Sequence, residues 1–183
     1  MIKIETKIKG AFIIKPIFID DIRGSFYTSF SRKTYTELGI LNTNIVQMNT
    51  SISKKNVIRG LHYQSGLNAQ AKLLWVSKGK IQDVFVDLRE DSPTFGQWDS
   101  VNMTNDGNRL FVPKGCAHGF LSLEDDTQVD YLVSNPYNKE SERTLIWNDP
   151  VREINWNYTD KPIISSKDLN GISFKYCEKY REY

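Results

Sequence analysis

The chain has little of what small secreted proteins or membrane proteins depend on. Its two cysteines, Cys116 and Cys177, are too few for a disulfide framework. The first ten residues alternate charged and apolar side chains, and no apolar run is long enough for a signal peptide or a membrane span. We therefore expect a cytoplasmic protein without membrane association.

Histidine is also scarce, because the chain has only two, His62 and His118. A cupin-type metal site takes about four nitrogen or oxygen ligands, and the HxH spacing typical of one is missing. The sequence has no glycine-rich phosphate loop, no GxGxxG and no GxSxG, and Cys116 lies in no activating context. These absences argue against metal catalysis and against a Cys–His nucleophile.

Net charge is close to zero, with 24 basic and 22 acidic residues giving +2. A protein that neutralises a nucleic-acid backbone needs a marked basic excess, so we expect no nucleic-acid partner. Any site for an anion must then be local.

Alternating and apolar stretches recur along the whole length of 183 residues and are separated by Gly and Pro turn signals. We count roughly ten short strands at a spacing of about 8–12 residues, which predicts an all-β sandwich, jelly roll or barrel. A Ser N-cap at 31 and a Gly stop at 39 predict one short helix, and residues 174–183 suggest a second. The length fits a single domain over residues 1–183.

One stretch, residues 56–74, concentrates polar side chains between apolar ones. It holds Arg59, His62, Gln70 and Lys72. Side chains alternate between the two faces of a strand, so several of these groups could face one interior. Burying cations there is costly without an anionic partner, which suggests a pocket for negative charge. The plainer interpretation is a hydrogen-bonded core histidine and a solvated lysine.

Proton transfer is the chemistry that these residue types leave open. A histidine acting as a base needs an orienting carboxylate, for which Asp83, Asp87 and Asp168 are candidates. Tyr131, on an alternating strand, could be the opposing acid, and a lysine could stabilise an enolate. This set matches proton abstraction next to a ketone, although composition alone allows other sets.

Several segments in order resemble one known family. The strings DIRGSF, VIRGLHYQ, AQAKLLWV, GKIQDVFVDLREDSPTFGQW, RLFVPKGCAHGFLSL, IWNDPVREINW and SSKD are similar to those of dTDP-4-dehydrorhamnose 3,5-epimerases and cover roughly residues 20–168. The resemblance implies a cupin-like β jelly roll, a homodimer, and catalysis without metal or cofactor. It also implies a nucleotide-linked 4-keto-6-deoxyhexose as the substrate, inverted at C3 and C5.

The resemblance also implies roles for individual residues. His62 matches the general base, Asp168 the carboxylate paired with it, and Tyr131 the acid on the other face of the sugar. Lys72 and His118 match residues around the sugar and its C4 oxygen. The remaining matches are substrate contacts: Arg23 and Arg59 for phosphate and nucleotide, Gln47 and Asn49 as polar contacts, Tyr137 as the aromatic that stacks on the base, and Glu142 and Lys167.

Four positions depart from the family pattern, namely Thr28, Met48, Ala71 and Pro136. The catalytic set is intact, so the departures concern the nucleotide more than the epimerisation. Three alternatives follow: a 3,5- or 3-only epimerase of a CDP- or GDP-linked sugar or heptose, a 3,4-ketoisomerase, and a non-catalytic nucleotide-sugar-binding jelly roll.

Overall fold

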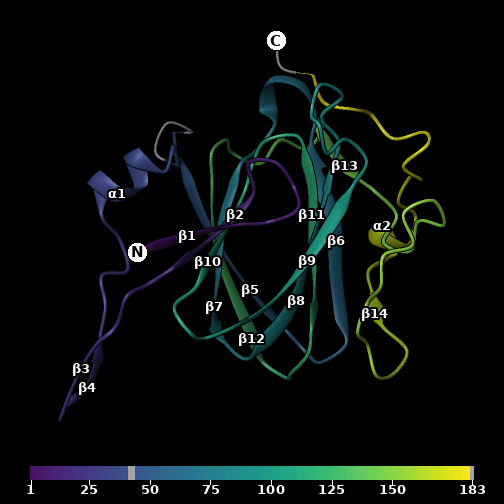
Figure 1. Cartoon of the computed structure of the whole chain (residues 1–183). Helices are drawn as coiled ribbons and strands as arrows, with labels where there is room; N and C mark the ends of the chain where they lie inside the picture. Colours follow the sequence, from purple (N-terminus) through teal and green to yellow (C-terminus); the bar gives the residue numbers. More distant parts are fainter. Residues whose placement is uncertain (41–43, 182–183) are drawn as a thin grey trace.

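The computed structural model describes residues 1–40 and 44–181, which form two facing β-sheets with short helices at the periphery (Figure 1). The first sheet has the strand order β1 (Ile2–Glu5), β2 (Phe12–Lys15), β10 (Arg109–Val112), β7 (Lys72–Lys78), β12 (Thr127–Val133) and β5 (Gln47–Ser53). The second has the order β13 (Glu142–Thr144), β6 (Val57–Gln64), β11 (Cys116–Ser122), β8 (Lys80–Asp87) and β9 (Trp98–Thr104). The predicted all-β fold of cupin type is confirmed.

All pairs within these two paths are antiparallel. The short strand β14 (Ile163–Ile164) instead lies parallel to β6 and brings a late part of the chain against the second sheet. A two-stranded hairpin, β3 (Ile19–Asp21) and β4 (Gly24–Phe26), projects away from both sheets at the lower left of Figure 1.

The core between the sheets follows from the alternation along each strand. On β7, Leu74 and Val76 face inward and are fully or almost fully buried. They meet Ile81 and Phe85 of β8, which share one face of the opposite sheet. Phe85 is completely buried, and burial of side chains of this size contributes about 1.5–3 kcal/mol each. This apolar packing fixes the distance between the sheets.

Both outer faces are also covered. Helix α1 (Arg32–Glu37) and its flanks place Tyr35 and Ile40 against the outer side of the first sheet. The predicted helix start is confirmed, because the Ser31 side chain accepts a hydrogen bond from the Thr34 backbone amide. The C-terminal segment packs Trp156, Phe174 and Cys177 on the outer side of the second sheet.

The helix predicted over residues 174–183 is wrong as far as the structure describes that range, which ends at 181. Residues 174–176 form a turn and Tyr180 makes an isolated bridge with Arg89. Phe174 and Cys177 are buried, while the Lys179 ammonium donates to backbone carbonyl oxygens of this turn. Tertiary contacts therefore override local helix propensity. The second helix is α2 (Ser166–Leu169), and a 3-10 turn covers Gly66–Asn68.

Candidate active site

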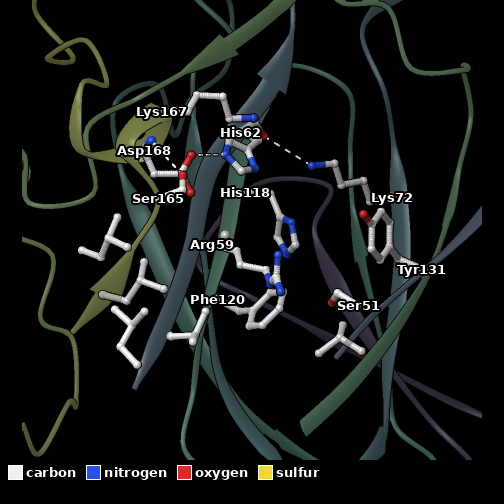
Figure 2. Close-up of a pocket in the computed structure, with 16 residues that line it drawn as sticks. Ser51, Arg59, His62, Lys72, His118, Phe120, Tyr131, Ser165, Lys167 and Asp168 are labelled. Atoms are coloured by element: carbon white, nitrogen blue, oxygen red, sulfur yellow. Dashed lines mark hydrogen bonds and ion pairs between the residues drawn. The ribbon is translucent and has the colours of Figure 1, made fainter. Parts of the chain in front are cut away.

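A cavity of about 520 Å³ lies where the apolar core gives way to polar side chains (Figure 2). Its walls come from β5, β7 and β12 of the first sheet and from β6 and β11 of the second, with α2 and β14 alongside. The lining includes seven of the predicted site residues, namely Arg59, His62, Lys72, His118, Tyr131, Lys167 and Asp168. The plainer interpretation of His62 and Lys72 is therefore not supported.

His62 and Asp168 form a close pair, although they are 106 residues apart in the chain. The Nε2 of His62 lies 2.6 Å from Oδ1 of Asp168. Burial of Asp168 opposes ionisation, but the hydrogen bonds from His62 and the Gly60 amide hold the pKa of this carboxyl below its usual value. An ionised carboxylate accepts only, so Nε2 carries the proton and Nδ1 is left as the basic nitrogen.

Two further hydrogen bonds fix the position of Asp168. Ser165 caps α2, and its side chain accepts a hydrogen bond from the Asp168 backbone amide at 3.1 Å. The Gly60 backbone amide donates to Asp168 Oδ2 at 3.0 Å. With both oxygens engaged and the residue only 3% exposed, the carboxylate has little freedom to leave His62.

Tyr131 lies on β12, across the cavity from His62 (Figure 2). Burial raises the pKa of its phenol, and the positive charges of Arg59 and Lys167 partly counter this effect. A phenol kept protonated can donate a proton from one side of a ligand while the imidazole removes one from the other.

Lys72 extends from β7 across the interior to the second sheet. Its Nζ donates to the backbone carbonyl of His62 at 3.3 Å, and the residue is 8% exposed. Burial lowers the pKa of the Lys72 ammonium to about 8, although Asp83 and Glu142 oppose the shift. An ammonium this close to a bound ketone would stabilise negative charge that develops on its oxygen.

His118 faces the same cavity and has its own carboxylate behind it. Its Nε2 lies 2.9 Å from Oδ2 of Asp83, which is completely buried. Burial lowers the pKa of His118 and raises that of Asp83, so both groups favour their neutral forms more than in water. The interaction orients the His118 ring as a hydrogen-bond donor or acceptor beside Lys72.

Further predicted contacts lie on β6 and β5, the strands that carry the cavity-lining residues Arg59 and Ser51. This side of the cavity is called its mouth. Arg59 donates through Nε to Ser53 Oγ at 2.9 Å, and so spans the gap between β6 and β5. Gln47 and Asn49 are half-buried on the inward side of β5 and bond to each other at 2.6 Å. These polar groups suit the charged and polar parts of a ligand whose reactive part lies deeper.

Tyr137, Glu142 and Lys167 form a connected group beside the mouth. Glu142 accepts from the Lys167 ammonium at 2.8 Å and from the Tyr137 hydroxyl at 3.2 Å. Burial raises the pKa of Glu142, but the hydrogen bonds from Lys167 and Tyr137 and the positive charge of Lys167 together outweigh burial and lower the pKa overall. Tyr137 itself is 58% exposed, so its ring is available for stacking.

Five predicted contacts do not line the cavity, namely Gln47, Asn49, Tyr137, Glu142 and Arg23. Of these, Arg23 belongs to a different part of the fold. It lies at the turn of the projecting β3–β4 hairpin, where Asp21 accepts from it at 2.5 Å. Its side chain is 86% exposed.

Two other candidates have structural roles. Asp87, one of the three carboxylates considered as a partner for a histidine, accepts hydrogen bonds from Arg89, Ser92 and Thr94. It therefore stabilises the turn after β8 and does not orient a histidine. Burial raises the pKa of the Cys116 thiol to about 12, which leaves no reactive thiolate beside His118.

The described residues contain neither a metal-binding cluster nor a membrane-spanning helix. No group of three or more His, Cys, Asp or Glu side chains in residues 1–40 and 44–181 is arranged to hold a metal ion. In the same part of the chain, no helix combines the length and the apolar character that a membrane span requires.

Among the departures from the family pattern, Met48 points away from the cavity and is 55% exposed.

Comparison with known proteins gives one consistent result. A family model described as dTDP-4-dehydrorhamnose 3,5-epimerase matches residues 5–176. The enzyme of that name from Salmonella typhimurium is 43% identical over 169 residues, which cover 92% of each chain. The crystal structure of the one from Elizabethkingia anophelis is 41% identical with a TM-score of 0.91, covering 96% of this chain and 97% of its own. The Legionella pneumophila epimerase, solved in complex with dTDP-4-keto-L-rhamnose, is 38% identical with a TM-score of 0.91, covering 99% of this chain and 98% of its own.

Proposed function

The chain belongs to the dTDP-4-dehydrorhamnose 3,5-epimerase family, and we propose that its cavity inverts C3 and C5 of dTDP-4-dehydro-6-deoxyglucose by acid–base catalysis. As an isomerase of a nucleotide-linked 4-keto sugar, it moves protons at carbons next to the ketone. The C–H bonds at C3 and C5 are acidic because the carbanion charge passes to O4. The match to this family disfavours the CDP- and GDP-linked alternatives.

His62 removes the proton from C5 through Nδ1, while Asp168 holds the ring and stabilises the imidazolium that forms. General-base catalysis of this kind contributes about 10²–10⁴-fold in rate. The electron pair of the C–H bond moves into the C4–C5 bond, and O4 becomes an enolate oxygen. Tyr131 then delivers a proton to C5 from the opposite face, which inverts the centre. Solvent then takes a proton from the His62 imidazolium and returns one to the Tyr131 phenolate, and the same sequence at C3 gives the double epimer.

Lys72 and His118 stabilise the enolate oxygen. Preorganised donors of this kind are worth roughly 3–4 kcal/mol each where the charge develops. The Lys72 ammonium is fixed by its contact with the His62 carbonyl, so little reorganisation accompanies charge development. The enolate needs no other electrophile in this scheme.

The single observation that carries the proposal is the placement of an oriented imidazole and a protonated phenol across one cavity. The imidazole belongs to the His62–Asp168 pair at 2.6 Å, and Tyr131 faces it from the other sheet (Figure 2). A binding module would have no need of a base whose tautomer is fixed, which is why we place the non-catalytic alternative last.

The experiment follows hydrogen exchange in deuterium oxide by NMR. The wild-type protein should incorporate deuterium at C3 and C5, whereas exchange at C5 alone or C3 alone would indicate a single epimerase. His62→Asn should abolish exchange at both carbons. Continued incorporation at C5 in that variant would exclude His62 as the base.

Tyr131→Phe separates the two half-reactions, because proton removal does not need the phenol. This variant should still exchange but should form little inverted product. Tyr176→Phe, at a tyrosine that is 73% exposed, is the matched control and should behave as wild type. Normal inversion by the Tyr131 variant would refute its role as the acid.

The remaining contacts complete the proposal for a single domain over residues 1–183. Arg59, Gln47 and Asn49 bind the diphosphate and nucleotide, Tyr137 stacks on the base, and Glu142 and Lys167 complete the mouth. A homodimer would let the projecting hairpin carry Arg23 to the partner's substrate. The hairpin also exposes Ile22 and Phe26, apolar side chains that a partner would cover. We place the enzyme in the cytoplasm, where nucleotide sugars are made.

A further inference from the structure

Strand β5 presents a row of four polar side chains to the interior. Burial along Gln47–Ser53 alternates, so Gln47, Asn49, Ser51 and Ser53 share the inward face while the residues between them are exposed. Polar side chains in a partly buried row need hydrogen-bond partners, and leaving one unpaired is costly. The partners of these four therefore show what each is for.

Three of the four are paired within the protein. Gln47 donates to Asn49 at 2.6 Å, and Ser53 accepts from Arg59 at 2.9 Å. The Ser51 hydroxyl is the exception: its oxygen is buried and has no hydrogen-bond partner among the described residues. Among the four side chains of this row, Ser51 alone therefore lacks a hydrogen bond to the described part of the protein.

The surroundings of Ser51 exclude most ways to satisfy it internally. Ser51 pairs in register with Val129, which is completely buried, and Phe120 lines the cavity across from it. Figure 2 shows Ser51 on the same side as Tyr131, with Arg59 and Phe120 facing it. The hydroxyl thus lies in the cavity wall between Val129 and the side chains of Arg59 and Phe120, without a partner among the described residues, so a bound ligand is its natural partner.

The strand register indicates which part of the substrate lies there. Tyr131 pairs with Asn49, so Ser51 lies two residues, or about 7 Å, further along the strand. In a pyranose ring the atom opposite C5 is C2. If Tyr131 serves C5 and Arg59 holds the phosphate on C1, then C2 and its hydroxyl lie next to Ser51.

We propose that Ser51 is a specificity-determining residue whose hydroxyl hydrogen-bonds the C2 hydroxyl of the sugar. The proposal rests on the proposed function, since it places the sugar between His62 and Tyr131. It adds a contact that selects 2-hydroxylated over 2-deoxygenated substrates. A site built to bond a hydroxyl discriminates against a ligand that lacks it, because the protein group is then left unpaired.

The test compares two substrates in two proteins. Wild type should prefer dTDP-4-dehydro-6-deoxyglucose over its 2-deoxy analogue, by about tenfold or more in kcat/KM. Ser51→Ala should lose about tenfold on the parent substrate and little on the analogue, so that the preference largely disappears. Affinity for dTDP alone should not change. Ser77→Ala, on the outer face of the same sheet, is the matched control.

Two results would overturn the assignment. Equal losses on both substrates, together with weaker binding of dTDP, would place Ser51 at the diphosphate. No change on either substrate would show that Ser51 makes no contact. Measuring affinity for both sugars in the His62→Asn background, with and without Ser51→Ala, tests the contact without turnover. This binding measurement decides the Ser51 contact by itself. A wild-type protein that fails to exchange deuterium would refute the proposed function, and the binding data would still show whether Ser51 contacts the C2 hydroxyl.

Discussion

Replacing Asp168 by Asn tests how the base is controlled. The carboxylate now accepts from two donors, the His62 ring at 2.6 Å and the Gly60 amide at 3.0 Å. An amide of the same shape has only one oxygen. If that oxygen stays with the Gly60 amide, the NH₂ group faces His62 Nε2, which must then become an acceptor. The ring proton moves to Nδ1, the nitrogen that should be free.

The expected loss follows from this tautomer change. In the stable tautomer of the variant, Nδ1 already carries a proton and cannot accept one from the substrate. The imidazolium that would form also loses the negative charge of Asp168. The same substitution behind a catalytic histidine in a serine protease lowers kcat about 10⁴-fold. We expect a loss of about 10³–10⁴-fold in kcat, or ~4–5.5 kcal/mol of transition-state stabilisation. KM should change much less, because the carboxylate does not touch substrate.

The assay is deuterium incorporation at C5 measured beside a thermal melt. Asp168→Asn should keep a cooperative melt, since the amide preserves the packing and one of the two hydrogen bonds. Asp160→Asn, at an exposed carboxylate shortly before α2, is the control and should retain full activity. If Asp168→Asn kept activity within tenfold of wild type, the orientation of His62 by a carboxylate would be excluded.

Two further predictions concern charge and assembly. The pKa of Lys72 is lowered to about 8 in the folded protein, so kcat should fall as pH rises through 8 and the ammonium loses its proton. Because the unfolded chain keeps this proton up to about pH 10.4, the Lys72 contribution to the free energy of unfolding should rise with pH between those values, by about 1.4 kcal/mol per unit. Unfolding of wild type and Lys72→Met at pH 7 and 9.5 measures this, and a constant difference between them would contradict it. Sedimentation equilibrium should give twice the mass of one chain, and Arg23→Ala should raise KM without lowering that mass. A monomer with full activity would exclude the shared site.

The strands were predictable because alternation and turn residues are local signals. The Ser31 cap and the end of α1 followed from the sequence for the same reason. The C-terminal helix did not form because Phe174 and Cys177 bury their side chains against the second sheet, an interaction that no local pattern encodes. Helix α2 was missed since four residues give too short a periodic signal.

Composition made the site predictable in its residue types but not in its pairings. Composition left Asp83, Asp87 and Asp168 equally available as partners for a histidine. The resemblance to the epimerase family implied the pairing of Asp168 with His62, and the docking of α2 brings the two together. The pairing of Asp83 with His118 depends on the register of β8 with β11 and had no signal in the sequence. Ser51 had a usable signal in the alternation of β5, but its lack of a partner appears only in three dimensions.

The parallel pairing of β14 with β6 has a consequence for biosynthesis. The ribosome makes the last strand of the two large sheets, which ends at Thr144, before it makes the segment that carries β14 and Asp168. Until that segment docks, His62 has no carboxylate to set its tautomer. Catalytic competence therefore depends on the docking of a segment that is made after both sheets.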